Sequence, residues 1–134
     1  QVFKLKKFIL ENIRIALKNS YIPVIYTSRK EKILENNLDQ IDFYNSLSFF
    51  VAEIVADIKN EIGYLISKGG ITSNTILNSS FNVDYVYLEG QIYSGISLVK
   101  VKLINNSYLP VITFPGNLGD DYSLKDVWQV IENK

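Results

Sequence analysis

The spacing of apolar residues predicts two amphipathic helices in the first half of the chain. Over residues 5–17, apolar side chains recur three or four positions apart, which places them on one face of a helix. A second stripe of this period runs over residues 41–58, and Gly63 stands where a helix-terminating residue is expected. Between the two stripes, the β-rich run 21–26 predicts a short strand in which Pro23 suits the start or an edge.

The second half of the chain predicts shorter elements. Apolar runs indicate strands over residues 64–67, 83–89, 96–104 and 109–113, and the last two are expected to pair as an antiparallel hairpin. Ile76 and Leu77 supply a small apolar face for a short helix, and Ser123 with Asp126 forms a capping-box arrangement ahead of a final helix. This order predicts a three-layer α/β/α fold with a mostly parallel sheet and a C-terminal hairpin.

Three glycine-containing turns follow predicted strands. They are Lys-Gly-Gly-Ile-Thr-Ser at 68–73, Gly-Gln-Ile-Tyr-Ser-Gly at 90–95 and Phe-Pro-Gly-Asn-Leu-Gly at 114–119. Glycine lets a backbone approach a ligand closely, and Thr72 or Ser73 could cap the following helix while its amides face an anion. The turns together predict one phosphate-holding nucleotide cleft, although a single Gly-Gly turn is more often a tight connection without a ligand.

Charged residues beside these turns allow two interpretations each. Arg29, after the first predicted strand, could reach a phosphate or could be a solvated surface side chain. Lys68 could act as a point charge for phosphate, but its surroundings lack the Walker spacing, so the turn is not a P-loop. Asp120 and Asp121 could help to hold Mg²⁺, but acids just before a helix also suit its dipole, and we favour the second interpretation.

Composition narrows the chemistry of this 134-residue chain. It has no cysteine and no histidine, which excludes disulfides, a thiolate nucleophile, cysteine-type zinc sites and a histidine base. Formal net charge is zero, so no electrostatic footprint for nucleic acid is present, and no apolar run is long enough to span a membrane. We expect one domain, a cytoplasmic location and, because methionine is absent, a piece of a longer polypeptide.

Four motifs in register resemble the C-terminal nucleotide-binding domain of the four-carbon acid sugar kinases, which phosphorylate tetronate-type acids with ATP. The motifs are Thr27-Ser28-Arg29 and the turns at 68–73, 90–92 and 114–120. The resemblance runs from about residue 21 to the end of this chain and matches roughly the last third of a family member. It implies that the sugar acid is bound mainly by a preceding domain, which also carries the acidic catalytic residues.

The resemblance also implies a set of nucleotide contacts. It implies that ATP, with Mg²⁺, is contacted by the second and third glycine turns at Gly90, Gln91, Ile92, Tyr93 and Gly116. The same cleft would be shaped by Gly69, Gly70, Thr72, Asn117 and Gly119. It gives this chain no catalytic residue and no metal-ligating residue. A homodimer is one assembly that we consider.

One departure from the family keeps a second function open. Where the family usually has Pro-Gly-Val-Pro, this chain has Ser94-Gly95-Ile96-Ser97, and losing both prolines loosens the loop that contacts the nucleotide. The leading hypothesis is the ATP-binding domain of a sugar-acid kinase, inactive by itself. The alternative is a non-catalytic nucleotide-sensing or protein-interaction domain.

Overall fold

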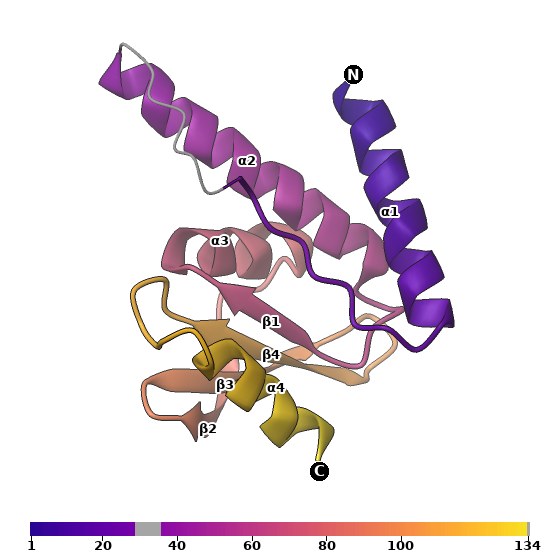
Figure 1. Cartoon of the computed structure of the whole chain (residues 1–134), viewed down its shortest axis with the longest axis vertical. Helices are drawn as coiled ribbons and strands as arrows, with labels where there is room; N and C mark the ends of the chain where they lie inside the picture. Colours follow the sequence, from indigo (N-terminus) through magenta and orange to yellow (C-terminus); the bar gives the residue numbers. More distant parts are fainter. Residues whose placement is uncertain (29–35, 134) are drawn as a thin grey trace. The chain divides into compact units, whose positions relative to one another are not determined.

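The structure, a computed structural model, describes residues 1–28 and 36–133 and divides into two compact units, Gln1–Leu47 and Ser48–Lys134. The first unit holds α1 (Val2–Lys18) and the beginning of α2 (Asn37–Ile58). The second unit holds the rest of α2 and all the strands of the described residues (Figure 1). The candidate site lies within the second unit.

Helix α1 confirms the first predicted stripe and ends at Lys18, one residue beyond it. Ser20 has a positive φ of 60°, its amide donates to the carbonyl of Leu17, and the amide of Tyr21 donates to that of Ala16. These two bonds form a Schellman motif, which satisfies carbonyls that the helix leaves unpaired at its end. The second stripe is confirmed by α2, which begins slightly earlier than predicted and ends at Ile58.

The strand predicted over residues 21–26 is wrong, because these residues form no strand in the structure. Pro23 has no N–H to give to a ladder, and apolar side chains on both sides of it, such as Tyr21 at 70% and Tyr26 at 84%, are exposed. High β-propensity makes a strand only where a neighbouring strand and a buried face are available. Of the motif after this run, Thr27 and Ser28 are exposed, and Arg29 lies outside the described residues.

Four strands form one sheet in residues 36–133. They are β1 (Leu65–Lys68), β2 (Tyr87–Tyr93), β3 (Ile96–Lys102) and β4 (Tyr108–Phe114), in the order β1-β4-β3-β2. The predicted hairpin is confirmed by the antiparallel pairing of β3 with β4. The expectation of a mostly parallel sheet is wrong: β1 with β4 is parallel, whereas both other pairs are antiparallel. Short turns join β2, β3 and β4, and a short turn can connect only antiparallel neighbours.

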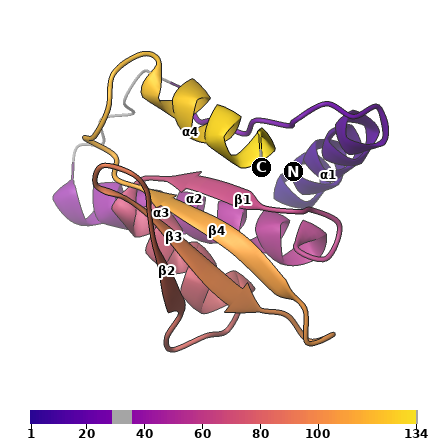
Figure 2. The same ribbon diagram turned by 90° about the horizontal axis from the view of Figure 1, so that it is seen from below.

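Helices cover both faces of this sheet, which confirms the α/β class and the three layers within the second unit. The last turns of α2, α3 (Gly70–Thr75) and the π-helical turn η1 (Ile76–Ser80) lie on one face, and α4 (Ser123–Glu132) lies on the other (Figure 2). Successive strand residues such as Val111 and Ile112 belong to clusters on opposite faces, as the pleat requires.

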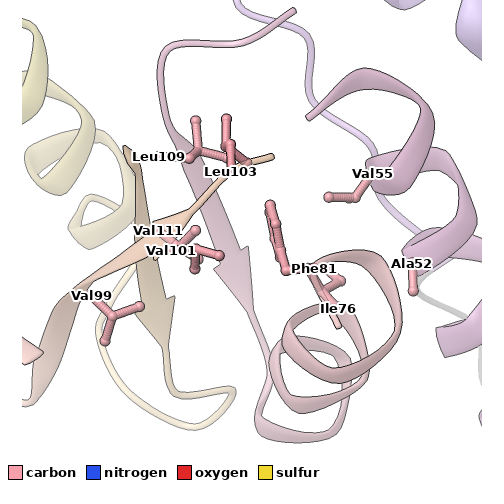
Figure 3. Close-up of a cluster of buried hydrophobic side chains, with 9 residues drawn as sticks. All are labelled: Ala52, Val55, Ile76, Phe81, Val99, Val101, Leu103, Leu109 and Val111. Atoms are coloured by element: carbon pink, nitrogen blue, oxygen red, sulfur yellow. The ribbon is translucent and has the colours of Figure 1, made fainter. Parts of the chain in front are cut away.

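The larger cluster lies between the sheet and the α2, α3 and η1 layer. Figure 3 shows the ring of Phe81 between strand residues on one side and helical residues on the other. The buried members are Ala52, Val55, Ile76, Phe81, Val99, Val101, Leu103, Leu109 and Val111. The smaller cluster, beneath α4, is built on buried Ile96, Ile112, Phe114 and Val127. Phe114 is the last residue of β4 and the first of the third glycine turn, so its burial anchors the start of that turn in the core.

None of the helices in residues 1–28 and 36–133 combines the length and the apolar character that crossing a membrane requires.

A tyrosine at the start of β1 should make stability fall at alkaline pH. The Tyr64 hydroxyl donates to Glu132 Oε1 at 2.6 Å, which ties the end of α4 to the sheet. Burial, and then the hydrogen bond to Glu132 and its negative charge, raise the pKa of Tyr64 from 10.0 to about 12. Since the folded-state pKa lies above the unfolded value, this contribution is complete below pH 10 and is lost as the pH rises toward 12.

Urea unfolding at a series of alkaline pH values tests this expectation. The wild-type chain should lose stability between pH 10 and 12, and Tyr64→Phe, which has no proton to lose at this position, should lose less. Equal losses in the two proteins would mean that other tyrosines, and not Tyr64, govern alkaline unfolding.

Candidate functional site

Two of the predicted glycine turns leave the sheet side by side. Strands β1 and β4 are parallel neighbours in which Lys68 pairs with Phe114, so both strands end at the same edge of the sheet. The amide of Gly69 donates to the carbonyl of Phe114 at 2.8 Å, which continues the ladder by one bond beyond the strands. Carboxyl ends of parallel strands are where α/β proteins usually bind ligands. The juxtaposition of the two turns is therefore as the sequence predicted.

The backbones of the two turns pass close to each other. A Cβ atom built on Gly116 would lie 3.6 Å from the Cα of Gly69, which is an ordinary van der Waals contact. A Cβ on Gly70 would meet none of the described residues within 4 Å, and neither Gly70 nor Gly116 has a positive φ. The fold alone therefore does not demand glycine at positions 70 and 116. The absence of side chains there leaves the backbone of both turns accessible.

The predicted caps of the helix after the first turn are wrong. Gly69, with φ 111°, occupies the N-cap position of α3, and no side chain in the described part of the chain caps this helix. Ser73 is buried, and its hydroxyl lies 2.9 Å from the Ser67 hydroxyl and 3.2 Å from the Ser67 carbonyl. Thr72 is half-buried. Ser73 thus joins α3 to β1 from inside the fold instead of satisfying the first amides of the helix.

The second predicted turn is also corrected, because Gly90 lies inside β2. The strand runs past the predicted end at Glu89, and the register with β3 shifts between Leu88 and Gly90 and again between Gln91 and Tyr93. Gly90 has φ 139°, a conformation that favours glycine and suits a β-bulge. Beside the bulge, Glu89 and Lys100 form an ion pair of 3.0 Å across the two strands.

The true turn between β2 and β3 is Ser94-Gly95, and it reaches the same corner as the other two turns. A Cβ on Gly95 would lie 3.0 Å from Leu118 Cδ2, so this hairpin passes close to the third glycine turn. Ile92 is half-buried in the cluster that also holds Leu118, whereas Gln91 and Tyr93 are exposed. Gln91 Oε1 accepts from the Gly95 amide at 3.4 Å. The Ser-Gly dipeptide was the sequence signal for this turn.

Lys68 bridges the first and third glycine turns. Its Nζ donates to the carbonyls of Pro115 at 3.2 Å and Leu118 at 3.1 Å, and it lies 4.0 Å from the centroid of the Phe114 ring. The sequence offered Lys68 as a phosphate ligand and gave no sign of this bridge, because its partners are backbone carbonyls almost fifty positions away. Lys68 thus links the first and third glycine turns by hydrogen bonds.

The third turn ends in a helix start that differs from the predicted capping box. Asp120 Oδ1 accepts hydrogen bonds from the amides of Tyr122 and Ser123 and from the Ser123 hydroxyl, so Asp120 satisfies the start of α4. These bonds, that of the Ser123 side chain first, hold the pKa of the Asp120 carboxyl below its ordinary value. Asp120 therefore lies at the start of α4, where the favoured interpretation placed it, and acts there through hydrogen bonds. Asn117 in the same turn is exposed.

The described residues thus bring together three of the four motifs, at 68–73, 90–92 and 114–120, because Ile92 and Leu118 pack against the same cluster. Within residues 1–28 and 36–133, no three Asp or Glu side chains gather closely enough to hold a metal ion.

Comparison with known families decides the membership of the chain. Residues 4–124 match the family model described as a nucleotide-binding C-terminal domain. The chain belongs to this family. The resemblance predicted from the motifs is therefore confirmed at the level of the family. No curated protein matches this nucleotide-binding C-terminal domain closely enough to count as a relative.

Solved structures share the fold of this nucleotide-binding C-terminal domain. Two crystal forms of a domain of unknown function (DUF1537) from Bordetella bronchiseptica, each described as a domain-swapped dimer with bound citrate, match it with TM-scores of 0.64 and 0.56. Sequence identity is 15% in both cases, and the matches cover 94% and 90% of this chain. They cover 31% and 30% of the Bordetella chains, so this chain spans about a third of their length.

Proposed function

We propose that this chain is the ATP-binding domain of a kinase that phosphorylates a four-carbon acid sugar, with ATP bound as its Mg²⁺ complex. In this proposal the domain is the C-terminal part of a two-domain enzyme, and the other domain binds the sugar acid and supplies the catalytic base. Membership of the nucleotide-binding C-terminal domains supports the nucleotide, and coverage of about a third of the Bordetella chains supports a larger whole.

The observation that carries the proposal is the meeting of the Gly69-Gly70 and Gly116 turns at the ends of parallel β1 and β4. Phosphoryl transfer needs a nucleotide held in a fixed position and donors preorganised for its charge, and little covalent chemistry from the protein. Backbone that is free of side chains can approach a triphosphate closely. Gly70 and Gly116 provide such backbone at positions where packing does not require glycine.

The remaining contacts of the proposed site come from the hairpin of β2 and β3. Tyr93 is 47% exposed at the end of β2, and Gly90, Gln91 and Ile92 precede it on the same strand. Because the hairpin turn meets Leu118, these residues belong to the same corner of the sheet as the Gly116 turn. We propose that these β2 residues contact the nucleotide. The shape of its site would come from Gly69, Thr72, Asn117 and Gly119.

A homodimer is part of the same proposal. The Bordetella structures are described as domain-swapped dimers. Helix α1 exposes large apolar side chains that a second copy could cover, namely Val2, Phe3, Leu5, Phe8 and Ile15.

Calorimetric titration of the 134-residue chain with ATP and Mg²⁺, compared with GTP and Mg²⁺, tests the proposed function. We expect binding that is selective for ATP, which would justify assaying the full-length protein with four-carbon sugar acids. If the 134-residue chain binds neither nucleotide, the same titration on the full-length protein separates two explanations. Binding by the full-length protein would mean that the preceding domain completes the site. No binding by either would contradict the kinase and favour an interaction domain.

A further inference from the structure

The Lys68 bridge gives this side chain a role that a phosphate ligand would not have. Its ammonium donates to two carbonyls, Pro115 and Leu118, that span the third glycine turn, and it faces the ring of Phe114 at the start of that turn. The amide of Leu118 also donates to the Pro115 carbonyl, at 3.3 Å, so the bridged carbonyls close the turn on itself. These three contacts of the ammonium thus all lie within one turn.

These contacts use most of the hydrogen-bonding capacity of the Lys68 ammonium. An ammonium has three N–H donors, two of which are directed to the carbonyls, and an aromatic face attracts the same cation. Direct binding of a phosphate would have to compete with these contacts. The carbonyl oxygens carry partial negative charge, which would repel an anion beside the turn, and the ammonium offsets this charge.

We propose that Lys68 is a positioning residue that fixes the Gly116 turn against the Gly69 turn in the ligand-free protein. It acts on the ligand through the turn and not by direct contact. That the ligand is a nucleotide rests on the proposed function, but the fixing of the turn does not. Both the backbone and the side chain of Lys68 support the proposal. Its backbone pairs with Phe114 in the β1–β4 register, and its ammonium donates to the carbonyls of Pro115 and Leu118.

Backbone ¹⁵N relaxation of the ligand-free chain tests this role directly. In the wild type, the amides of Gly116, Asn117 and Leu118 should have order parameters near the ~0.85 of rigid backbone. In Lys68→Met, which keeps most of the apolar stem and removes the charge, they should fall below about 0.6. Lys68→Arg should restore most of the order, because guanidinium also stacks on rings and donates to carbonyls.

Lys102→Met is the matched control. Lys102 is exposed at the end of β3 that pairs with the start of β4, so it lies at the opposite end of these strands from the Gly116 turn. In the Lys102→Met protein, the order parameters of the Gly116 turn should equal those of the wild type. Should Lys68→Met fail to fold, Lys68→Gln keeps a neutral donor and should give an intermediate loss of order.

Titration with ATP and Mg²⁺ separates positioning from direct contact. Lys68→Met should weaken ATP binding by roughly tenfold, the effect of losing about one charge-assisted hydrogen bond, and Lys68→Arg should recover most of it. If Lys68→Met lost affinity while the turn stayed ordered, Lys68 would be a phosphate ligand and the proposal would be wrong. If neither the wild-type chain nor the full-length protein bound ATP, the proposed function alone would be contradicted, because relaxation still reports on the turn.

Discussion

Gly119→Ala is expected to lower the melting temperature of the chain by roughly 10 °C or more, the largest stability effect that we expect from a single methyl group here. Gly119 has φ 87°, in the left-handed region, where a residue with a Cβ is disfavoured by about 1–2 kcal/mol. The added Cβ would also lie 2.7 Å from Ser123 Cβ and 3.1 Å from Phe114 Cζ. Overpacking of this kind typically adds about 1–3 kcal/mol.

Neither neighbour can move aside easily. Ser123 is the first residue of α4, so its Cβ is bonded directly to the helix backbone. Phe114 is only 2% exposed and lies in the smaller core cluster. Relief of the contact would therefore shift the start of α4 and disturb the hydrogen bonds between Ser123 and Asp120. The two contributions together give a loss of about 2–5 kcal/mol in the free energy of unfolding.

Gly63→Ala is the matched control for this substitution. A Cβ on Gly63 would meet nothing within 4 Å, and Gly63 does not have a positive φ. Alanine there should leave stability unchanged or raise it by less than about 1 kcal/mol, because it restricts the unfolded chain. Thermal unfolding followed by circular dichroism measures both variants. A Gly119→Ala protein that melts with the wild type would show that the turn adopts another conformation in solution.

The parts of this fold that could be predicted from sequence are those in which local pattern and tertiary context agree. The stripes of α1 and α2 repeat over many residues, and β3 and β4 are joined by a short turn that leaves little choice of partner. The run 21–26 has the composition of a strand but pairs with no strand among the described residues, and propensity alone does not supply a partner. Strand β2 ends further toward the C-terminus than predicted. Its bulge contains Gly90, and a glycine inside a strand looks like a turn in the sequence.

The candidate site shows the same limit. Glycine turns after strands could be recognised one by one, and their repeated position after strands predicted that they share one cleft. The pairing of β1 with β4, which are far apart in sequence, could not be read from the chain and decides which turns meet. The hydrogen-bond partners of Lys68 and of Asp120 were also hidden, because they include backbone groups, which every residue carries.

Gly116→Val should weaken binding of ATP and Mg²⁺ by roughly ten- to a hundredfold while the chain stays folded. A Cβ at this position makes only an ordinary contact with Gly69, at 3.6 Å, and Gly116 does not have a positive φ. The fold can therefore accept a side chain. The two methyl groups of valine would, however, fill the space between the turn backbone and the triphosphate in the proposed site.

Calorimetric titration, with urea unfolding of the same samples, measures affinity and stability together. Gly116→Ala should give a smaller loss of affinity than Gly116→Val, and Gly63→Val, which adds the same groups at an open position away from the turns, should bind as the wild type does. Wild-type affinity in a folded Gly116→Val protein would mean that a nucleotide does not lie against the Gly116 turn. Binding would then have to be sought along the exposed residues of β2, where Gln91 and Tyr93 lie.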